Sequence, residues 1–255
     1  MKKVNKLVYA GLFSALALVL GLVQIPTPFA PYLAIDGSEI VVLVAGNFFG
    51  FGVMSTVIIL RSVLRFVFGL STGFAIIGEV AALISSFIFG GMFLLIKKYT
   101  KDKNSTFKTN NIIAIILLLL LIPFTYYAFQ LDNNPWLIVG LITLYLPLVA
   151  YGIYLLIYRK RSVKYSTKIL EATSAIMVNT IFMTLANFFF LTPSNMLQKP
   201  ATFTTVVNEL GIPLNVFVLS AILPLVPFNI LKGIVSVIVY FLLEGTISVV
   251  VKRCK

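Results

Sequence analysis

An asparagine and a lysine stand in the first turns of an apolar run near the C-terminus, VPFNILKGIVSVIVYFLLEG, which begins at Val226. Asn229, Lys232, Ser236 and Tyr240 are separated by 3, 4 and 4 residues. On a helix that turns about 100° per residue, this spacing places them in one polar stripe. Amide, ammonium and hydroxyl groups recognise polar molecules by hydrogen bonding. The stripe therefore predicts one wall of a small-molecule pocket.

Other apolar runs carry polar residues at a similar depth. Thr184 and Asn187 fall on one face of the run at 169–191. A buried charge costs about 2.5–3.5 kcal/mol at the centre of a membrane helix, so such charges usually face protein or a water-filled cavity. The charges that meet this description are Arg61, Arg65, Glu79 and Lys232.

Asn187, Asn229, Lys232, Arg65 and Glu79 lie toward the outer ends of their runs. Their common depth predicts a pocket that opens to the outside of the cell. Structural roles are the alternative for each residue. Threonine and asparagine bond neighbouring helices or their own backbone, an arginine pairs with a glutamate, and a lysine near a helix end extends to the interface.

The elements that must position these residues follow from composition. Of 255 residues, 60% are apolar and only 11% are charged, which indicates an all-α integral membrane helical bundle. We expect a single membrane domain over residues 1–255, with apolar spans near 7–24, 38–51, 53–69, 74–96, 112–130, 136–158, 169–191 and 216–243.

The net charge of +12 is gathered in clusters at span ends, which excludes a nucleic-acid partner and favours contact with the lipid bilayer. The clusters are 2–6, 97–108, 159–168 and 252–255. By the positive-inside rule they predict eight crossings of the plasma membrane, with both termini in the cytoplasm. The outer loops at 25–37 and 192–215 are rich in proline. The first cannot be helical throughout, and the second is typical of a lid or a surface-lying segment.

Several reaction classes have no residues to support them. The chain has no histidine and one cysteine, Cys254, so we expect no metal site and no disulfide within one chain. The sequence contains no P-loop, no HExxH and no GxSxG motif. We therefore predict a protein that is not an enzyme and has no cofactor. Work that needs energy would draw on a partner or an ion gradient.

Several of these stretches resemble the riboflavin-specific S components, the substrate-binding subunits of energy-coupling factor (ECF) vitamin transporters. The matching segments are IPTPFAPYLAIDGSEI with the following span to FFGFG, LRSVLRFVFG, IGEVAALISS, ANFFFLTP and VPFNILKGIVSVIVYFLL. The PFNxxKG element is the most specific of them. The resemblance covers roughly 1–98 and 167–250.

The resemblance implies a six-helix core (1–98 and 167–255) that binds riboflavin near the outer face. It implies partnership with a transmembrane coupling subunit and two ATPase subunits. The family's flavin contacts correspond here to Asn187, Asn229 and Lys232, and its first outer loop corresponds to Tyr32, Leu33, Ile35 and Asp36. The small residues that meet the coupling subunit correspond to Ala10, Gly11, Ser14 and Ala15.

This chain departs from the family in one place, because an extra helical hairpin is expected at about 109–160. Two readings remain beside riboflavin capture. One is the same subunit type for another vitamin or for FMN. The other is an ion-coupled secondary transporter that uses Glu79 and the two arginines.

Overall fold

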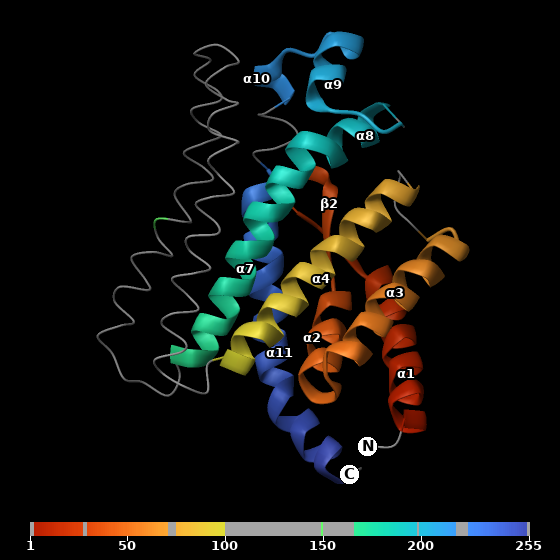
Figure 1. The fold of residues 1–255 in the computed structure, drawn as a ribbon, viewed down its shortest axis with the longest axis vertical. Helices are drawn as coiled ribbons and strands as arrows, with labels where there is room; N and C mark the ends of the chain where they lie inside the picture. The colour runs from red at the N-terminus through yellow and green to blue at the C-terminus, as the bar shows by residue number, and fades with distance from the viewer. Residues whose placement is uncertain are drawn as a thin grey trace. The chain divides into compact units, whose positions relative to one another are not determined.

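The computed structural model describes residues 3–27, 30–70, 75–99, 149, 166–197, 199–217 and 224–253. Its elements (Figure 1) are α1 (Lys3–Leu22), β1 (Gln24–Thr27), β2 (Ala30–Asp36), α2 (Ser38–Phe49), α3 (Phe51–Val67), α4 (Ala75–Tyr99), α7 (Ser166–Ala186), the π-helical turn η1 (Asn187–Leu191), α8 (Thr192–Leu197), α9 (Phe203–Leu210), α10 (Leu214–Phe217) and α11 (Leu225–Arg253). They divide into a first unit, Met1–Leu94 with Leu231–Lys255, and a second unit, Leu95–Ile230.

Helices occupy the predicted spans wherever the structure describes them, and the helical membrane character of the chain is confirmed. Among the described residues, three helical stretches are long and apolar enough to cross a bilayer: Ile76–Lys98, Lys168–Ser194 and Leu225–Val251. Shorter apolar helices cover Lys6–Leu22 and Ser38–Phe49. The predicted spans 112–130 and 136–158, and with them the helical hairpin at about 109–160, lie outside the described residues except for Val149.

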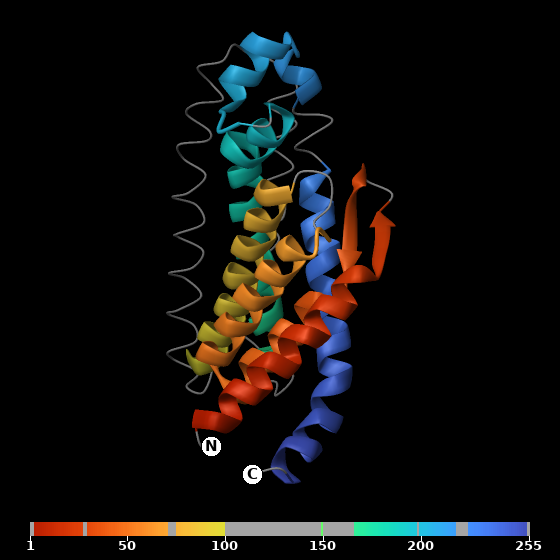
Figure 2. The same ribbon diagram turned by 90° about the vertical axis from the view of Figure 1, so that its right-hand side faces the viewer.

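The proline-rich segment at 25–37 forms a two-stranded antiparallel hairpin (Figure 2), an addition to the all-helical expectation. Gln24 pairs with Asp36 and Ile25 with Ile35. Proline is tolerated in this ribbon because each strand has a free edge that needs no N–H donor. The strand β2 ends at Asp36 and α2 begins at Ser38, so Asp36 lies beside the start of that helix.

In the first unit, α1, α2 and α3 pack against one another around a core of aliphatic residues (Figure 2). Ala10 and Ala17 let α1 approach closely, and Met54 of α3 is fully buried at the centre. Two glycines make room for that methionine. A Cβ added at Gly46 of α2 or at Gly90 of α4 would lie 2.9 or 2.8 Å from Met54 Sδ.

In the second unit, α7 continues into α8 through the wide turn η1. Pro193 explains the wide turn, because its ring nitrogen cannot donate the hydrogen bond that a regular helix requires. The predicted outer segment 192–215 is largely helical. Within this segment the Ser194 hydroxyl exchanges hydrogen bonds with the backbone of Ala201. The rings of Phe188 and Phe217 pack together with 6.0 Å between their centroids.

Two adjacent glycines of α4 allow a matched test of this packing. Gly90→Ala places a Cβ 3.2 Å from the stiff Val42 side chain as well as against Met54, so we expect a loss of about 1–3 kcal/mol of stability. Gly91→Ala has its nearest neighbour at 3.9 Å and should be neutral or stabilising by up to about 1 kcal/mol. Chemical unfolding in mixed micelles measures both variants. Equal stabilities would contradict the packing described.

Candidate functional site

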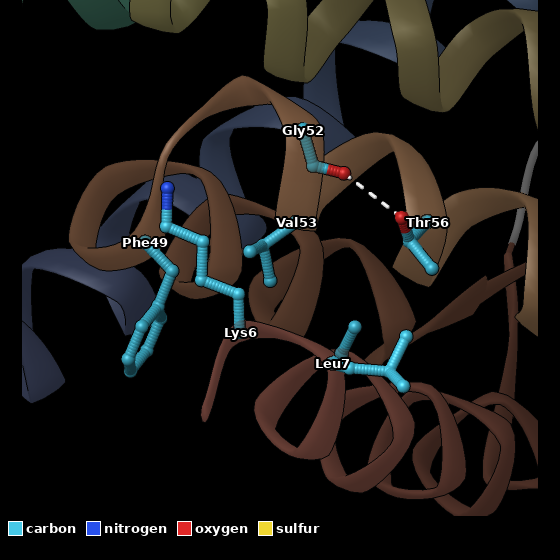
Figure 3. A pocket seen from close by; sticks show the side chains of 7 residues that line it. Lys6, Leu7, Phe49, Gly52, Val53 and Thr56 are labelled. Carbon is cyan, nitrogen blue, oxygen red and sulfur yellow. Dashed lines mark hydrogen bonds between the residues drawn. The ribbon is translucent and has the colours of Figure 1, made fainter. Parts of the chain in front are cut away.

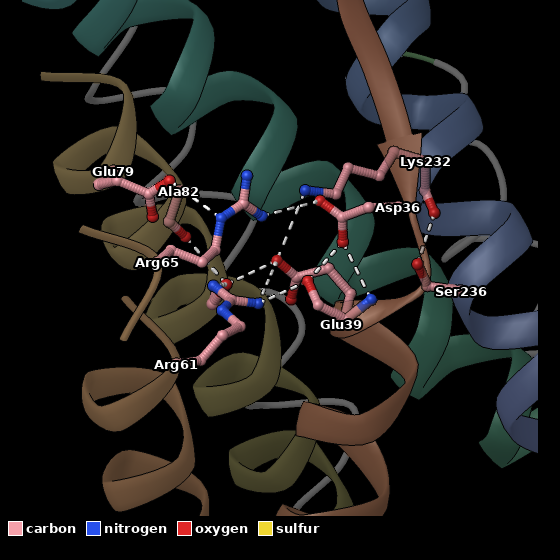
Figure 4. A network of polar contacts seen from close by, with 10 residues as sticks. Asp36, Glu39, Arg61, Arg65, Glu79, Ala82, Lys232 and Ser236 are labelled. Atoms are coloured by element: carbon pink, nitrogen blue, oxygen red, sulfur yellow. Dashed lines mark hydrogen bonds and ion pairs between the residues drawn. The ribbon is translucent and has the colours of Figure 1, made fainter. Parts of the chain in front are cut away.

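Six charged side chains meet inside the first unit, where the start of α2, the last turns of α3, the first turns of α4 and the N-terminal half of α11 come together (Figure 4). We call them the charge cluster: Asp36, Glu39, Arg61, Arg65, Glu79 and Lys232. Their ion pairs cross from one element to another. The cluster therefore joins parts of the chain that are distant in sequence.

Glu39 lies at the centre of the cluster and is only 1% exposed. Its Oε1 atom is 3.8 Å from Arg61 Nη1 and 3.5 Å from Lys232 Nζ. The Ser86 hydroxyl lies 2.5 Å from the same oxygen. One carboxylate oxygen thus faces cations from α3 and α11 and a hydroxyl from α4.

Arg61, at 2% exposure, is buried as deeply as Glu39. Its Nη1 donates to Ser38 Oγ at 2.7 Å, and its Nη2 donates to Ser86 Oγ at 2.8 Å. Ser86 therefore connects the guanidinium and the carboxylate, besides approaching the carbonyl of Ala82 at 2.8 Å. Such shared hydrogen bonds are what make a buried ion pair tolerable.

Arg65 holds the second half of the cluster. Its Nε is 3.0 Å from Glu79 Oε1, and its Nη1 is 3.8 Å from Asp36 Oδ2. Gly21 of α1 leaves the space for this guanidinium, since an added Cβ would lie 3.2 Å from Arg65 Nη1. The side chain thus passes beside α1 and links the hairpin to α4.

Asp36, at the end of β2, is held ionised by its surroundings. Burial alone would raise the pKa of its carboxyl group, but the Lys232 ammonium, the hydrogen bonds from Ser38 and the Arg61 guanidinium together lower that pKa below its ordinary value. The backbone N–H of Ser38 donates to Asp36 Oδ1 at 2.9 Å. Asp36 therefore contributes a negative charge and also anchors the first turn of α2.

Five residues that the sequence singled out meet in this cluster: Asp36, Arg61, Arg65, Glu79 and Lys232. Ile35 precedes them in β2 and is buried. The backbones of Tyr32 and Leu33 lie in the same strand, while their side chains fall outside the described part of the chain. The ion pair between Arg65 and Glu79, one of the structural alternatives, is present.

Four other predicted site residues bond to the backbone of their own helix. Thr184 Oγ1 donates to the carbonyl of Thr180 at 2.7 Å, and Ser236 Oγ donates to that of Lys232 at 2.8 Å. The side-chain amides of Asn187 and Asn229 each donate one N–H to the carbonyl of the residue four positions earlier in the chain. These bonds occupy the two hydroxyl protons, whereas each amide keeps a second N–H and an oxygen. The Asn187 oxygen also accepts a bond from Thr192 at 3.2 Å.

Sequence reasoning missed Glu39 as a site residue. Its one signal was its place in an otherwise apolar helix, where a carboxylate in the first turn also suits the helix dipole and needs no other explanation. Only the packing of α3 and α11 against that turn shows that the carboxylate faces inward. The central residue of the cluster was therefore the hardest to recognise.

The residues proposed to face a partner divide into two pairs on α1. Ala10 and Ser14 are 2% exposed, and the Ser14 hydroxyl donates to the carbonyl of Ala10 at 2.7 Å. Gly11 and Ala15 lie on the exposed side of the helix. An added Cβ at Gly11 would meet nothing within 4 Å, so this side is open to close approach.

A pocket of about 220 Å³ lies at the other end of α2 from Glu39 (Figure 3). Lys6, Leu7 and Ala10 of α1 line it together with Phe49, Gly52, Val53 and Thr56. The Thr56 hydroxyl donates to the carbonyl of Gly52 at 3.0 Å, so its proton is already used within α3. The volume is below the 300–1,000 Å³ that is typical of ligand sites.

Apolar helices that bury matched charges define a multi-pass membrane protein. The profile of the family "ECF transporter, substrate-specific component" matches residues 5–131 and 114–244, and the chain therefore belongs to this family. It is the substrate-binding S component of a transporter and not an enzyme. S components of this family work with a coupling subunit and ATPases.

One solved structure, described as "Structure and mechanism of the S component of a bacterial ECF transporter", is similar in fold. The TM-score is 0.53 at 21% sequence identity, and the alignment covers 99% of this chain and 100% of the other. No curated protein matches the sequence. The likeness supports the S-component fold.

Removal of one charge from the buried pair should be costly. Arg61→Leu leaves Glu39 buried with one cation fewer, so we expect a loss of about 3–5 kcal/mol of unfolding free energy. The double variant Arg61→Leu with Glu39→Leu should recover much of that loss. As a control, Lys199→Ala breaks a pair whose side chains are 53% and 44% exposed and should cost less than about 1 kcal/mol. An Arg61→Leu protein as stable as the wild type would refute a structural role for the pair.

Proposed function

We propose that this S component captures riboflavin at the outer face of the membrane and delivers it inward with a coupling subunit and two ATPases. Lys232 carries the proposal. It stands in the PFNILKG element that resembles the riboflavin-specific subunits, and its side chain, at 14% exposure, is less buried than that of Arg61 or Arg65. The bond to Glu39 uses at most one of its three N–H donors.

The chemistry of riboflavin suits these side chains. The flavin ring system is flat, and its uracil-like edge carries both donors and acceptors. A carboxamide offers a donor and an acceptor in one plane, and an ammonium group donates to a carbonyl. On the strength of the resemblance, we propose that Asn187, Asn229 and Lys232 contact this edge and that Asp36, Arg61, Arg65 and Glu79 contribute to the same site. The hydroxyl protons of Thr184 and Ser236 are bonded within their own helices, so in the proposed site these residues offer their oxygens to the ligand as acceptors.

The helix ends support an orientation with both termini in the cytoplasm. Basic residues mark the start of α1 (Lys3, Lys6), the end of α4 (Lys97, Lys98), the start of α7 (Lys168) and the end of α11 (Lys252, Arg253). By the positive-inside rule these ends face inward. In this arrangement the six-helix core consists of α1, α2, α3, α4, α7 and α11. The helical hairpin expected at about 109–160 would add two crossings.

Purification from cells supplied with riboflavin tests the ligand directly. We expect the protein to carry a yellow flavin chromophore. Lys232→Ala and Asn229→Ala should each weaken riboflavin binding by about 10- to 100-fold, because each removes a hydrogen bond to the ligand in a buried setting. Quenching of flavin fluorescence measures the dissociation constants, with the exposed Lys199→Ala as an unchanged control. Colourless protein, with no binding that depends on Lys232, would defeat the proposal.

The exposed side of α1 supplies a second test. Small residues let membrane helices approach closely, so we propose that Gly11 and Ala15 face the coupling subunit while Ala10 and Ser14 pack inside the bundle. Gly11→Leu and Ala15→Leu should prevent copurification with the coupling subunit and ATPases, yet leave riboflavin binding by the isolated subunit unchanged. Gly245→Leu adds the same bulk at an open position of α11 and should leave assembly intact. Normal assembly of both α1 variants would place the contact elsewhere.

A further inference from the structure

The charge cluster is electrically balanced. Its ion pairs join three carboxylates, Asp36, Glu39 and Glu79, to the three cations Arg61, Arg65 and Lys232. Each cation lies within 4 Å of at least one of these carboxylates. With all six groups ionised the cluster has no net charge, and Lys232 is the least buried of its three cations.

The balance matters because the cluster is buried. A unit charge that acts over about 10 Å at an effective dielectric constant of about 20 changes an affinity by about tenfold. A neutral ligand can accept a hydrogen bond from Lys232 without disturbing the existing ion pairs. An anionic ligand has to compete with a carboxylate for the same ammonium group, so the balanced cluster disfavours it.

Glu39 is the carboxylate that sets this competition. It is the group paired with Lys232, and Arg61 shares the same oxygen. Its second oxygen, Oε2, is buried and has no hydrogen-bond partner among the described residues. Because one oxygen of this carboxylate makes no hydrogen bond, we expect Glu39 to act on Lys232 mainly through its negative charge.

A second contact holds Lys232 in register with Glu39. Eight residues further along both helices, the Asn47 amide of α2 donates to the Tyr240 hydroxyl of α11. The two pairs have the same sequence separation, 193 residues, so α2 and α11 run in parallel. The Tyr240 hydroxyl in turn donates to Glu244 Oε1 at 3.2 Å. Two contacts, Glu39 with Lys232 and Asn47 with Tyr240, therefore fix the alignment of α2 with α11.

We propose that Glu39 is the specificity-determining residue of this S component: by neutralising Lys232 it makes the site select an uncharged ligand over an anionic one. This inference rests on the proposed function. Glu39 acts through Lys232 and does not itself contact the ligand, so its removal should change the choice between ligands as well as the affinity for each.

The test compares riboflavin with riboflavin 5′-phosphate, whose phosphate carries about −1.5 to −2 charge at neutral pH. The measured quantity is the ratio of the two dissociation constants, which is insensitive to a general loss of folded protein. Wild-type protein should prefer riboflavin. Glu39→Gln leaves the cluster with one excess positive charge. At about tenfold for each unit of phosphate charge, its preference for riboflavin should fall by about 30- to 100-fold.

Two further variants guard against a merely structural effect. Lys232→Gln leaves an excess negative charge and should shift the ratio in the opposite direction, even if both ligands bind less tightly. Glu39→Asp keeps the charge and should retain the wild-type ratio. Glu209→Gln removes an exposed carboxylate of α9, 44% accessible at its side chain, and should also leave the ratio unchanged.

The outcomes separate the two proposals. If wild-type protein binds neither flavin, the proposed function fails. If it binds riboflavin while Glu39→Gln and Lys232→Gln leave the ratio within about twofold of the wild type, or shift it in the same direction, only the role of Glu39 is overturned. The shift should persist at about 0.5 M salt, because salt screens exposed charges far more than buried ones. A shift that disappears in salt would assign the preference to the basic surface instead.

Discussion

Compensation of charge inside an apolar bundle is the constraint on which the rest of this structure depends. Arg61 and Glu39 are almost inaccessible, and neither would be tolerated there alone. Besides each other, their partners come from α2, α4 and α11. The six groups thus fix which ends of four helices meet, and at which level. The apolar packing around Met54 holds the helices of the first unit together. The charge cluster specifies how these helices are aligned.

Polar residues in this chain perform two distinct tasks. Thr184, Ser236 and both candidate asparagines bond to a carbonyl one turn back, which uses one donor of each wherever the helix lies. The charged residues, together with Asn47 and Tyr240, bond across to other elements. Only the second kind specifies which helices pack together. Short side chains can reach the carbonyl one turn back, whereas Asn47 bonds across to α11 instead.

Hydropathy located the helices well, since the span expected at 53–69 is α3 at Phe51–Val67 and that expected at 38–51 is α2 at Ser38–Phe49. Four charged members of the site, Arg61, Arg65, Glu79 and Lys232, were also predictable, because charge within an apolar run is costly and needs a partner. The strand pairing of the hairpin was not. Prolines excluded a helix there but did not specify a partner. Glu39 escaped notice because a carboxylate in a first turn has a local explanation.

Lys232, the proposed ligand contact, illustrates why a buried cation needs a counter-charge of its own. An unpaired ammonium group at this depth would favour any anion and would destabilise the bundle when no ligand is bound. Pairing it with Glu39 at 3.5 Å removes that cost yet leaves donors free, because the contact is long and engages one oxygen. In the proposed site, the same carboxylate that stabilises the empty state would also limit which ligands bind. Stability of the membrane bundle and selectivity of the subunit are, on this view, consequences of one buried ion pair.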